Sequence, residues 1–144
     1  MPIINQADLQ TNMYAEVIEE ITRADAGITE LAIATAIQEA KTYLARYNLV
    51  ALFGTETTEP EIEDQYLKTL VKDIACWRLI RLCNTGVDYS VFRTAYLDAI
   101  AALTAIMKGQ AQPDGWPYAD TGNITVPEGT TVEWHSNPRR ENHY

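Results

Sequence analysis

Two kinds of residue in this sequence could carry chemistry, namely a run of carboxylates and a pair of histidines. The carboxylates lie just before and at the start of a predicted helix, and they are Glu56, Glu59, Glu61, Glu63 and Asp64. Paired carboxylates can act as general acid and base, but this run has no histidine, nucleophile or Gly-rich loop beside it. Acidic residues also favour the positive end of a helix dipole. We therefore interpret the run as a helix start with a solvated loop, and we expect no enzymatic activity.

The histidines and cysteines do not form a recognisable metal site. His135 and His143 both lie near the C-terminus, and no upstream histidine completes a site with them. The sequence has neither a paired-cysteine zinc pattern nor a helical His-Glu-x-x-His. Cys76 and Cys83 would lie about 10 Å apart along one helix, which is too far for a disulfide. We therefore predict no catalytic residue, no cofactor and no metal.

The composition limits the class of protein. The 144 residues suit one domain, and the formal net charge of −9 argues against a dedicated nucleic-acid binder. An acidic surface suits a protein that nucleic acid passes without sticking, although ordinary solubility charge is the commoner explanation. No apolar run approaches the roughly 18 residues of a membrane span, and the N-terminus lacks a secretory signal. We expect a soluble protein made and kept inside a cell.

Apolar residues at helical spacing predict four helices, over residues 7–23, 29–47, 60–83 and 90–108. An apolar strap, residues 49–53, is expected to fold back over these helices because five exposed apolar residues are costly. The predicted fold class is therefore all-α, with a four-helix bundle-like core in a domain of residues 1–112.

The last predicted helix has an unusual outer side. Leu97, Ala101 and Ala105 lie opposite its expected core face, so that side is only weakly polar. Two explanations fit this pattern. The helix packs on two sides within its own subunit, or it exposes a smooth strip to a neighbouring subunit.

The sequence changes character at Pro113. Residues 113–144, which we call the C-terminal arm, lack helical periodicity but contain two strand-like stretches around Pro127-Glu128-Gly129. Chain ends without core contacts rarely order alone, so we predict that the arm binds a partner by strand addition or forms a local hairpin. The residues expected to bind the partner are Ile124, Val126, Val132, Trp134, Arg139, Arg140 and Tyr144.

Two arginines, Arg78 and Arg81, fall within the apolar sector of the third predicted helix. Side chains that extend past the core into solvent are the simpler interpretation, since both lie near the helix end. The alternatives are an ion pair with Asp88 or Asp98, or a contact across a subunit interface, where arginine is enriched. We therefore include both arginines among the candidate partner-binding residues.

Several stretches, taken in order, resemble one protein family. They are Glu19–Thr22, Ala36–Ala40 with Tyr43–Tyr47, Leu70–Leu79, Tyr96–Ile100, and Met107–Gly109 with a proline following. This pattern is similar to the small neck proteins of tailed phages and prophages in the Mu-like group, which act in head completion or head–tail joining. The matching motifs are packing motifs and cover most of residues 5–113. Many members stop soon after the fourth helix, so the arm is a departure.

The resemblance implies a structural virion protein of the phage neck, assembled in the host cytoplasm. Such adaptors form a homo-oligomeric ring, commonly a dodecamer, between the portal protein and the tail or stopper proteins. DNA passes through the lumen without specific binding, and no membrane is involved. The resemblance implies no active site, and it implies that Arg46-Tyr47 and Asp73–Trp77 define the fold.

Two other functions stay open at this stage. The first is a cytoplasmic helical regulatory or assembly-chaperone module that binds a partner through the arm, and it would be absent from purified particles. The second is an enzyme that uses the acidic run, which we rank last because nothing beside the run completes a site.

Overall fold

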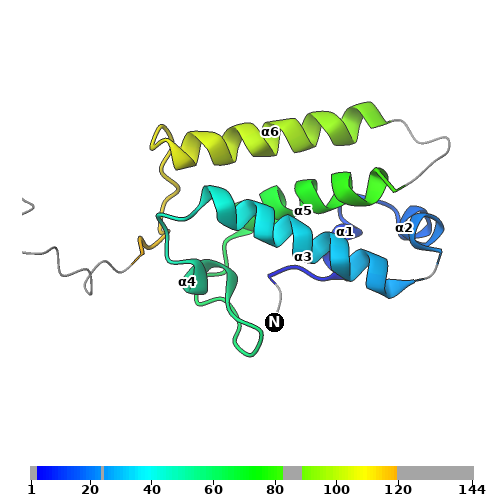
Figure 1. Ribbon diagram of the computed structural model, residues 1–144, viewed down its shortest axis with the longest axis horizontal. Coiled ribbons are helices and arrows are strands. Elements are labelled where there is room, and N and C mark those ends of the chain that lie inside the picture. Colours follow the sequence, from blue (N-terminus) through cyan, green and yellow to red (C-terminus); the bar gives the residue numbers. More distant parts are fainter. Residues whose placement is uncertain (1–2, 24, 83–88, 120–144) are drawn as a thin grey trace, which may run out of the picture.

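The computed structural model describes residues 3–23, 25–82 and 89–119 (Figure 1). Every regular element in these residues is an α-helix, which confirms the all-α class. The helices are α1 (Gln6–Leu9), α2 (Ala15–Thr22), α3 (Ala26–Tyr43), α4 (Leu49–Phe53), α5 (Gln65–Ile80) and α6 (Tyr89–Met107). The strand-like stretches of the arm lie outside the described residues, so the predicted strand or hairpin stays a prediction.

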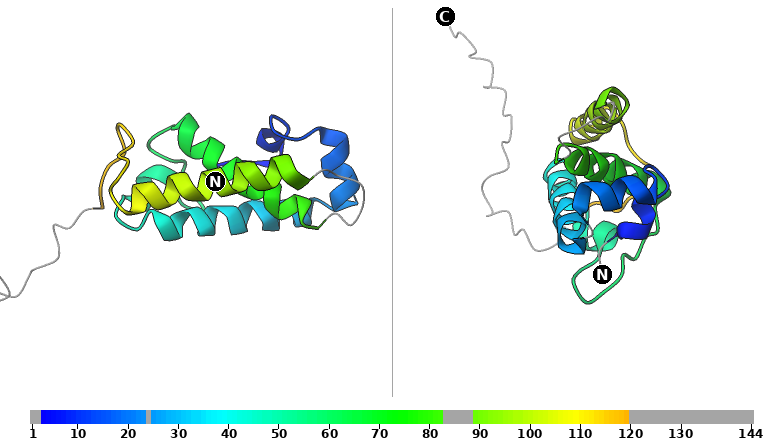
Figure 2. Two further views of the ribbon diagram at one scale, coloured as in Figure 1. Left: turned by 90° about the horizontal axis from the view of Figure 1, so that it is seen from above. Right: turned by 90° about the vertical axis from the view of Figure 1, so that its right-hand side faces the viewer.

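Helix α5 is the centre of the core. It contacts α1, α2, α3 and α6, and half of its residues are buried. The end-on view in Figure 2 shows α6 lying over α5 on one side of the molecule, with the other helices on the opposite side. Helices α2 and α4 lie at opposite ends of α3 (Figure 1). The two ends of α3 therefore present different surfaces.

The prediction of one helix over residues 7–23 is wrong, because the structure has α1 and α2 with a turn between them. Asn5 and Asp8 form a capping box that starts α1. The turn is then held against α5, since Asn12 donates to Asp73 (3.1 Å) and Lys72 donates to Thr11 (3.0 Å). These long-range contacts stop the first helix where its apolar spacing alone would continue it.

The apolar strap is a short helix, α4, where the sequence analysis expected a loop. Asn48 caps it by accepting from the Ala51 N–H (3.2 Å), and Ala51, Leu52 and Phe53 are buried, as expected for the strap. Gly54 ends it at φ 72° and ψ −169°, a backbone conformation that is essentially restricted to glycine.

Helix α5 begins later than predicted, at Gln65, because Asp64 caps it. The Asp64 carboxylate accepts from the Leu67 N–H at 2.8 Å. The helix ends at Ile80, with Arg81 as its C-cap, three residues before the predicted end.

Helix α6 has an apolar surface that is largely exposed. It begins at Tyr89, so Ser90, the predicted N-cap, lies in its first turn, and Gly109 follows it at φ 77°. Only Ala99, Leu103 and Ile106 are buried among its described side chains. The segment Ser90–Met107 is long and apolar enough, with a mean hydropathy of 1.3, to cross a membrane by length and composition alone. The sequence analysis missed this segment because two charged residues interrupt its apolar run.

The first residues of the arm return to the helical core. Residues 110–119 run from the end of α6 to the corner between α3 and α4 (Figure 1). There, Tyr47 and Tyr118 form an antiparallel bridge, and Trp116 is buried. The expectation that the arm lacks core contacts is therefore wrong for this part. We call residues 113–119 the root of the arm, and residues 120–144 the distal arm.

Candidate partner-binding surface

Seven of the nine predicted partner-binding residues lie in the distal arm, outside the described residues: Ile124, Val126, Val132, Trp134, Arg139, Arg140 and Tyr144. The other two are Arg78 and Arg81, at the end of α5. The structure places them in different surroundings, because Arg78 is partly buried and Arg81 is exposed.

Arg78 forms an ion pair with Glu39 of α3. The Glu39 carboxylate accepts from Nη2 at 2.7 Å and from Nε at 3.3 Å on one oxygen. Its other oxygen accepts from the Tyr96 hydroxyl of α6 at 2.7 Å. This group of three residues, which we call the Glu39 cluster, therefore ties together the three longest helices.

The preferred interpretation of Arg78 as a solvent-directed side chain is wrong, because Arg78 pairs with Glu39, and the alternative partner Asp98 is wrong as well. Asp88, the other alternative partner, lies outside the described residues. Glu39 lies on α3, which packs closely against α5, and its side chain is only 18% exposed. A carboxylate that has lost most of its water is stabilised by a charged donor. The hydrogen bond to Glu39 raises the pKa of Arg78. The exposed position of Arg81 agrees with a side chain that reaches solvent.

Three of the stretches that resemble phage neck proteins contribute a residue to this cluster. Glu39 belongs to the stretch 36–40, Arg78 to 70–79 and Tyr96 to 96–100. Trp77 also stacks on Tyr96, with ring centroids 5.9 Å apart. The sequence signal that could have found the pair is a carboxylate between small apolar residues, because Glu39 lies beside Ala36 and Ala40, which are both fully buried in α3.

The root of the arm is held by a second cluster, which no residue pattern had singled out. The Trp116 indole N–H donates to Asp64 Oδ2 at 2.8 Å, while Oδ1 of the same carboxylate caps α5. The Trp116 ring meets Tyr47 edge-on with centroids 5.5 Å apart. Trp116 is 5% exposed, so the arm begins from a point that is fixed on the helical core.

Backbone hydrogen bonds fix the direction of the root. The Asn48 N–H donates to the Pro117 carbonyl and the Ala119 N–H donates to the Arg46 carbonyl, both at 2.9 Å. Tyr118 stacks on Tyr47, with centroids 5.1 Å apart and an interplanar angle of 16°. Burial, and then the neighbouring Tyr118, raise the pKa of Tyr47. The distal arm therefore starts beside the C-terminal end of α3.

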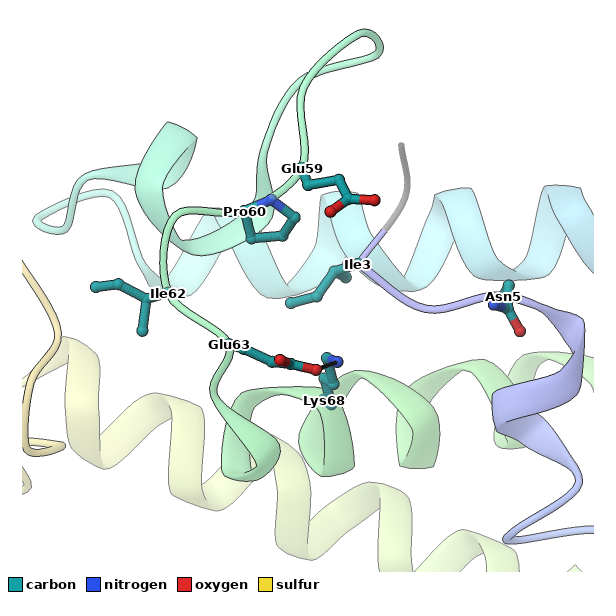
Figure 3. Close-up of a pocket in the computed structure, with 7 residues that line it drawn as sticks. All are labelled: Ile3, Asn5, Glu59, Pro60, Ile62, Glu63 and Lys68. Atoms are coloured by element: carbon teal, nitrogen blue, oxygen red, sulfur yellow. Dashed lines mark hydrogen bonds and ion pairs between the residues drawn. The ribbon is translucent and has the colours of Figure 1, made fainter.

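The acidic run is divided among structural tasks. Figure 3 shows Glu59 and Glu63 beside a small hollow of about 280 Å³, between the N-terminal segment and the loop before α5. Glu63 pairs with Lys68 at 3.0 Å. Asp64 caps α5 and binds Trp116. An activity test that replaces Asp64 would therefore also disturb folding.

Within residues 3–23, 25–82 and 89–119, no group of three or more His, Cys, Asp or Glu side chains is arranged to hold a metal ion. Both histidines lie in the distal arm. Cys76 is buried in α5, and this burial raises the pKa of its thiol to about 12. Such a thiol is a poor nucleophile at neutral pH, because the reactive form is the thiolate.

A cleft of about 480 Å³ lies between α2, α3 and the end of α5. Its walls are mostly apolar, and they include Leu31 and Leu82, which are 70% and 55% exposed. Among the described residues in its walls, Arg23 and Arg78 are the only charged ones. We call it the arginine-edged cleft.

Comparison of the chain with protein-family models and with curated proteins gives no match. The resemblance to phage neck proteins therefore stays a prediction that depends on the quoted stretches.

Proposed function

We propose that this protein is a structural adaptor of a tailed-phage neck, which joins head and tail as a homo-oligomeric ring beside the portal. In this proposal its helical core belongs to the four-helix type of head–tail adaptors, and DNA passes through the ring without specific binding. The proposal assigns no catalytic residue and no cofactor. The distal arm joins each subunit to a neighbour.

The observation that carries the proposal is the anchored root of the arm. Trp116 is buried and bonded to Asp64, and residues 117–119 are bonded to residues 46–48. A segment that starts from a fixed point loses less freedom when it binds than one that starts from a loose end. This arrangement supports an arm whose task is to connect subunits.

The net charge of −9 also supports the proposal, since an acidic lumen would repel DNA phosphates. The weakly polar outer side of α6 is a second surface that fits a packed ring. Leu97 is 51% exposed and Val91 is 68% exposed there.

The test is a truncation after Ala119, which keeps the root and removes the distal arm. We expect the shortened protein to fold as stably as the full chain but to form no ring and no infectious particles. Truncation after residue 112 would be a poor test, because it also removes Trp116 from the core. A full-length variant with residues 120–144 in scrambled order controls for chain length.

Two results would contradict the proposal. If infectious particles form with the chain ending at Ala119, the distal arm does not join subunits. Electron microscopy of particles that locates no copy of this chain in the neck would remove the adaptor function. In that case, a cytoplasmic assembly-chaperone module that binds its partner through the arm becomes the better explanation.

A further inference from the structure

The arginine-edged cleft has a composition that is unusual for this chain. The sequence has 20 acidic and 11 basic residues, yet Arg23 and Arg78 are the only charged residues in the part of the cleft wall that the structure describes. Glu39 occupies only part of the Arg78 guanidinium, through Nε and Nη2. A guanidinium has five N–H donors, so further donors stay available to an anionic group.

Arg23 occupies a position that normally favours glycine. It is the C-cap of α2 at φ 52° and ψ 40°, and it is the one non-glycine residue with a positive φ in residues 3–23, 25–82 and 89–119. A left-handed conformation is unfavourable for a residue that carries a side chain. Glycine would avoid this cost, so an arginine here suggests a use for its side chain in the cleft.

The apolar walls call for an apolar occupant. Leu31 and Leu82 are large side chains that are more than half exposed, and they flank the nearly buried Ile21 and Ala32. Exposed apolar groups of this kind, edged by charge, are typical of protein-binding surfaces. The ligand that fits is a short peptide with large apolar side chains and a carboxylate between them.

The distal arm contains such a peptide. In Val132-Glu133-Trp134, a carboxylate lies between a branched and an aromatic side chain. We infer that this segment of one copy binds the arginine-edged cleft of a second copy, with Glu133 facing Arg23 and Arg78. The inference rests on the proposed function, because it names the surface that receives the arm in the ring.

The proposed ring favours a second copy over the same chain. The root ends beside Arg46 and Tyr47, whereas the cleft lies along the N-terminal half of α3. From Leu31 to Tyr43, the last residue of α3, the helical rise amounts to about 18 Å. A donor at one end of a subunit and a receptor at the other make a head-to-tail contact, and such contacts form a ring when the rotation between subunits closes. The segment from Ala119 to Val132 spans up to roughly 45 Å when extended. This length reaches a neighbour and also the cleft of the same subunit, so the experiment must distinguish contacts between copies from contacts within one copy.

The experiment uses the full chain with a photo-crosslinking amino acid in place of Leu31. Because Leu31 is 70% exposed, this change should leave the fold intact. Isotopically heavy and light chains are mixed, refolded together and irradiated, and the joined peptides are identified by mass spectrometry. The same label in place of Leu97, on α6 and away from the cleft, is the matched control.

The expected result is a crosslink from position 31 to a peptide within residues 120–144, in mixed heavy–light pairs. The Leu97 label should not give it. Arg23→Gly should lower the yield at least several-fold while leaving thermal stability equal or higher. Crosslinks only within one copy, crosslinks to a helical surface, or none to residues 120–144 would each overturn the inference.

The test separates this inference from the proposed function. A heavy–light crosslink in a protein that particles do not contain would support the inference and contradict the adaptor function. Particles that contain the chain in the neck without this crosslink would support the adaptor function and contradict the inference.

Discussion

Replacement of Trp116 by alanine is the sharpest test of the anchored root. Truncation of a buried tryptophan costs roughly 3–5 kcal/mol in a well-packed core. Trp116 lies at the edge of this core, and the chain beyond it can move away, so we expect the lower figure, about 3 kcal/mol. Its hydrogen bond to the Asp64 carboxylate (2.8 Å) accounts for roughly half of that cost.

Two conservative substitutions separate the hydrogen bond from the packing. Trp116→Phe keeps an aromatic ring against Tyr47 but removes the indole N–H. Asp64→Asn keeps an oxygen to cap α5, but turns an amide N–H₂ toward the indole donor. We expect each to cost about 1.5 kcal/mol, and we expect the double variant to cost clearly less than the sum, because both remove the same bond.

The assay is urea unfolding followed by circular dichroism, since fluorescence would change with the loss of a tryptophan. The free energies of unfolding of the unchanged protein, Trp116→Phe, Asp64→Asn and the double variant form a double-mutant cycle. If Trp116→Ala changes stability by less than about 0.5 kcal/mol, the root is not docked. If Trp116→Phe and Asp64→Asn are additive, the hydrogen bond between them is absent in solution.

Three further predictions concern the core. Arg78→Met should cost about 1–2 kcal/mol in urea unfolding, because Glu39 keeps little water and loses its charged partner; an unchanged free energy would contradict the ion pair. Gly54→Ala should cost about 2 kcal/mol or more, since its Cβ would lie 2.5 Å from a backbone oxygen, whereas Gly115→Ala, with φ 78° but open space, should cost less. With the other cysteine replaced by serine, Cys76 should resist alkylation until urea unfolds the chain. Its thiol pKa of about 12 also means that its contribution to stability is complete below pH 9 and is lost as pH rises toward 12.

Local pattern was enough to predict much of the helical structure but not where helices stop. The cores of α3, α5 and α6 follow from apolar spacing, and Gly109 follows the end of α6 as expected. The break between α1 and α2 could not be found in this way. It depends on Asn12 and Thr11 bonding to α5, about sixty residues away along the chain.

The candidate surface was predictable only in part, for the same reason. Wheel geometry singled out Arg78, and the sequence analysis considered Asp88 and Asp98 as its partners. The actual partner, Glu39, lies on another helix and can be identified only once the helices are packed. Trp116 was overlooked because it stands among turn-forming residues without periodicity. Its burial comes from Tyr47 and Asp64, two residues that meet only in the folded chain.

The Glu39 cluster and the cluster around Trp116 act on different parts of the subunit in the proposed ring. The Glu39 cluster fixes α3, α5 and α6 to one another, so it fixes one wall of the arginine-edged cleft as well, through Arg78. The Trp116 cluster fixes where the arm begins. Loss of the Glu39 cluster should therefore weaken the cleft that receives an arm, and loss of the contacts of Trp116 should weaken the arm that is donated. In the proposed head-to-tail ring each subunit supplies both the arm and the cleft. A mixture of the two kinds of variant should then regain only those contacts that join an intact arm to an intact cleft.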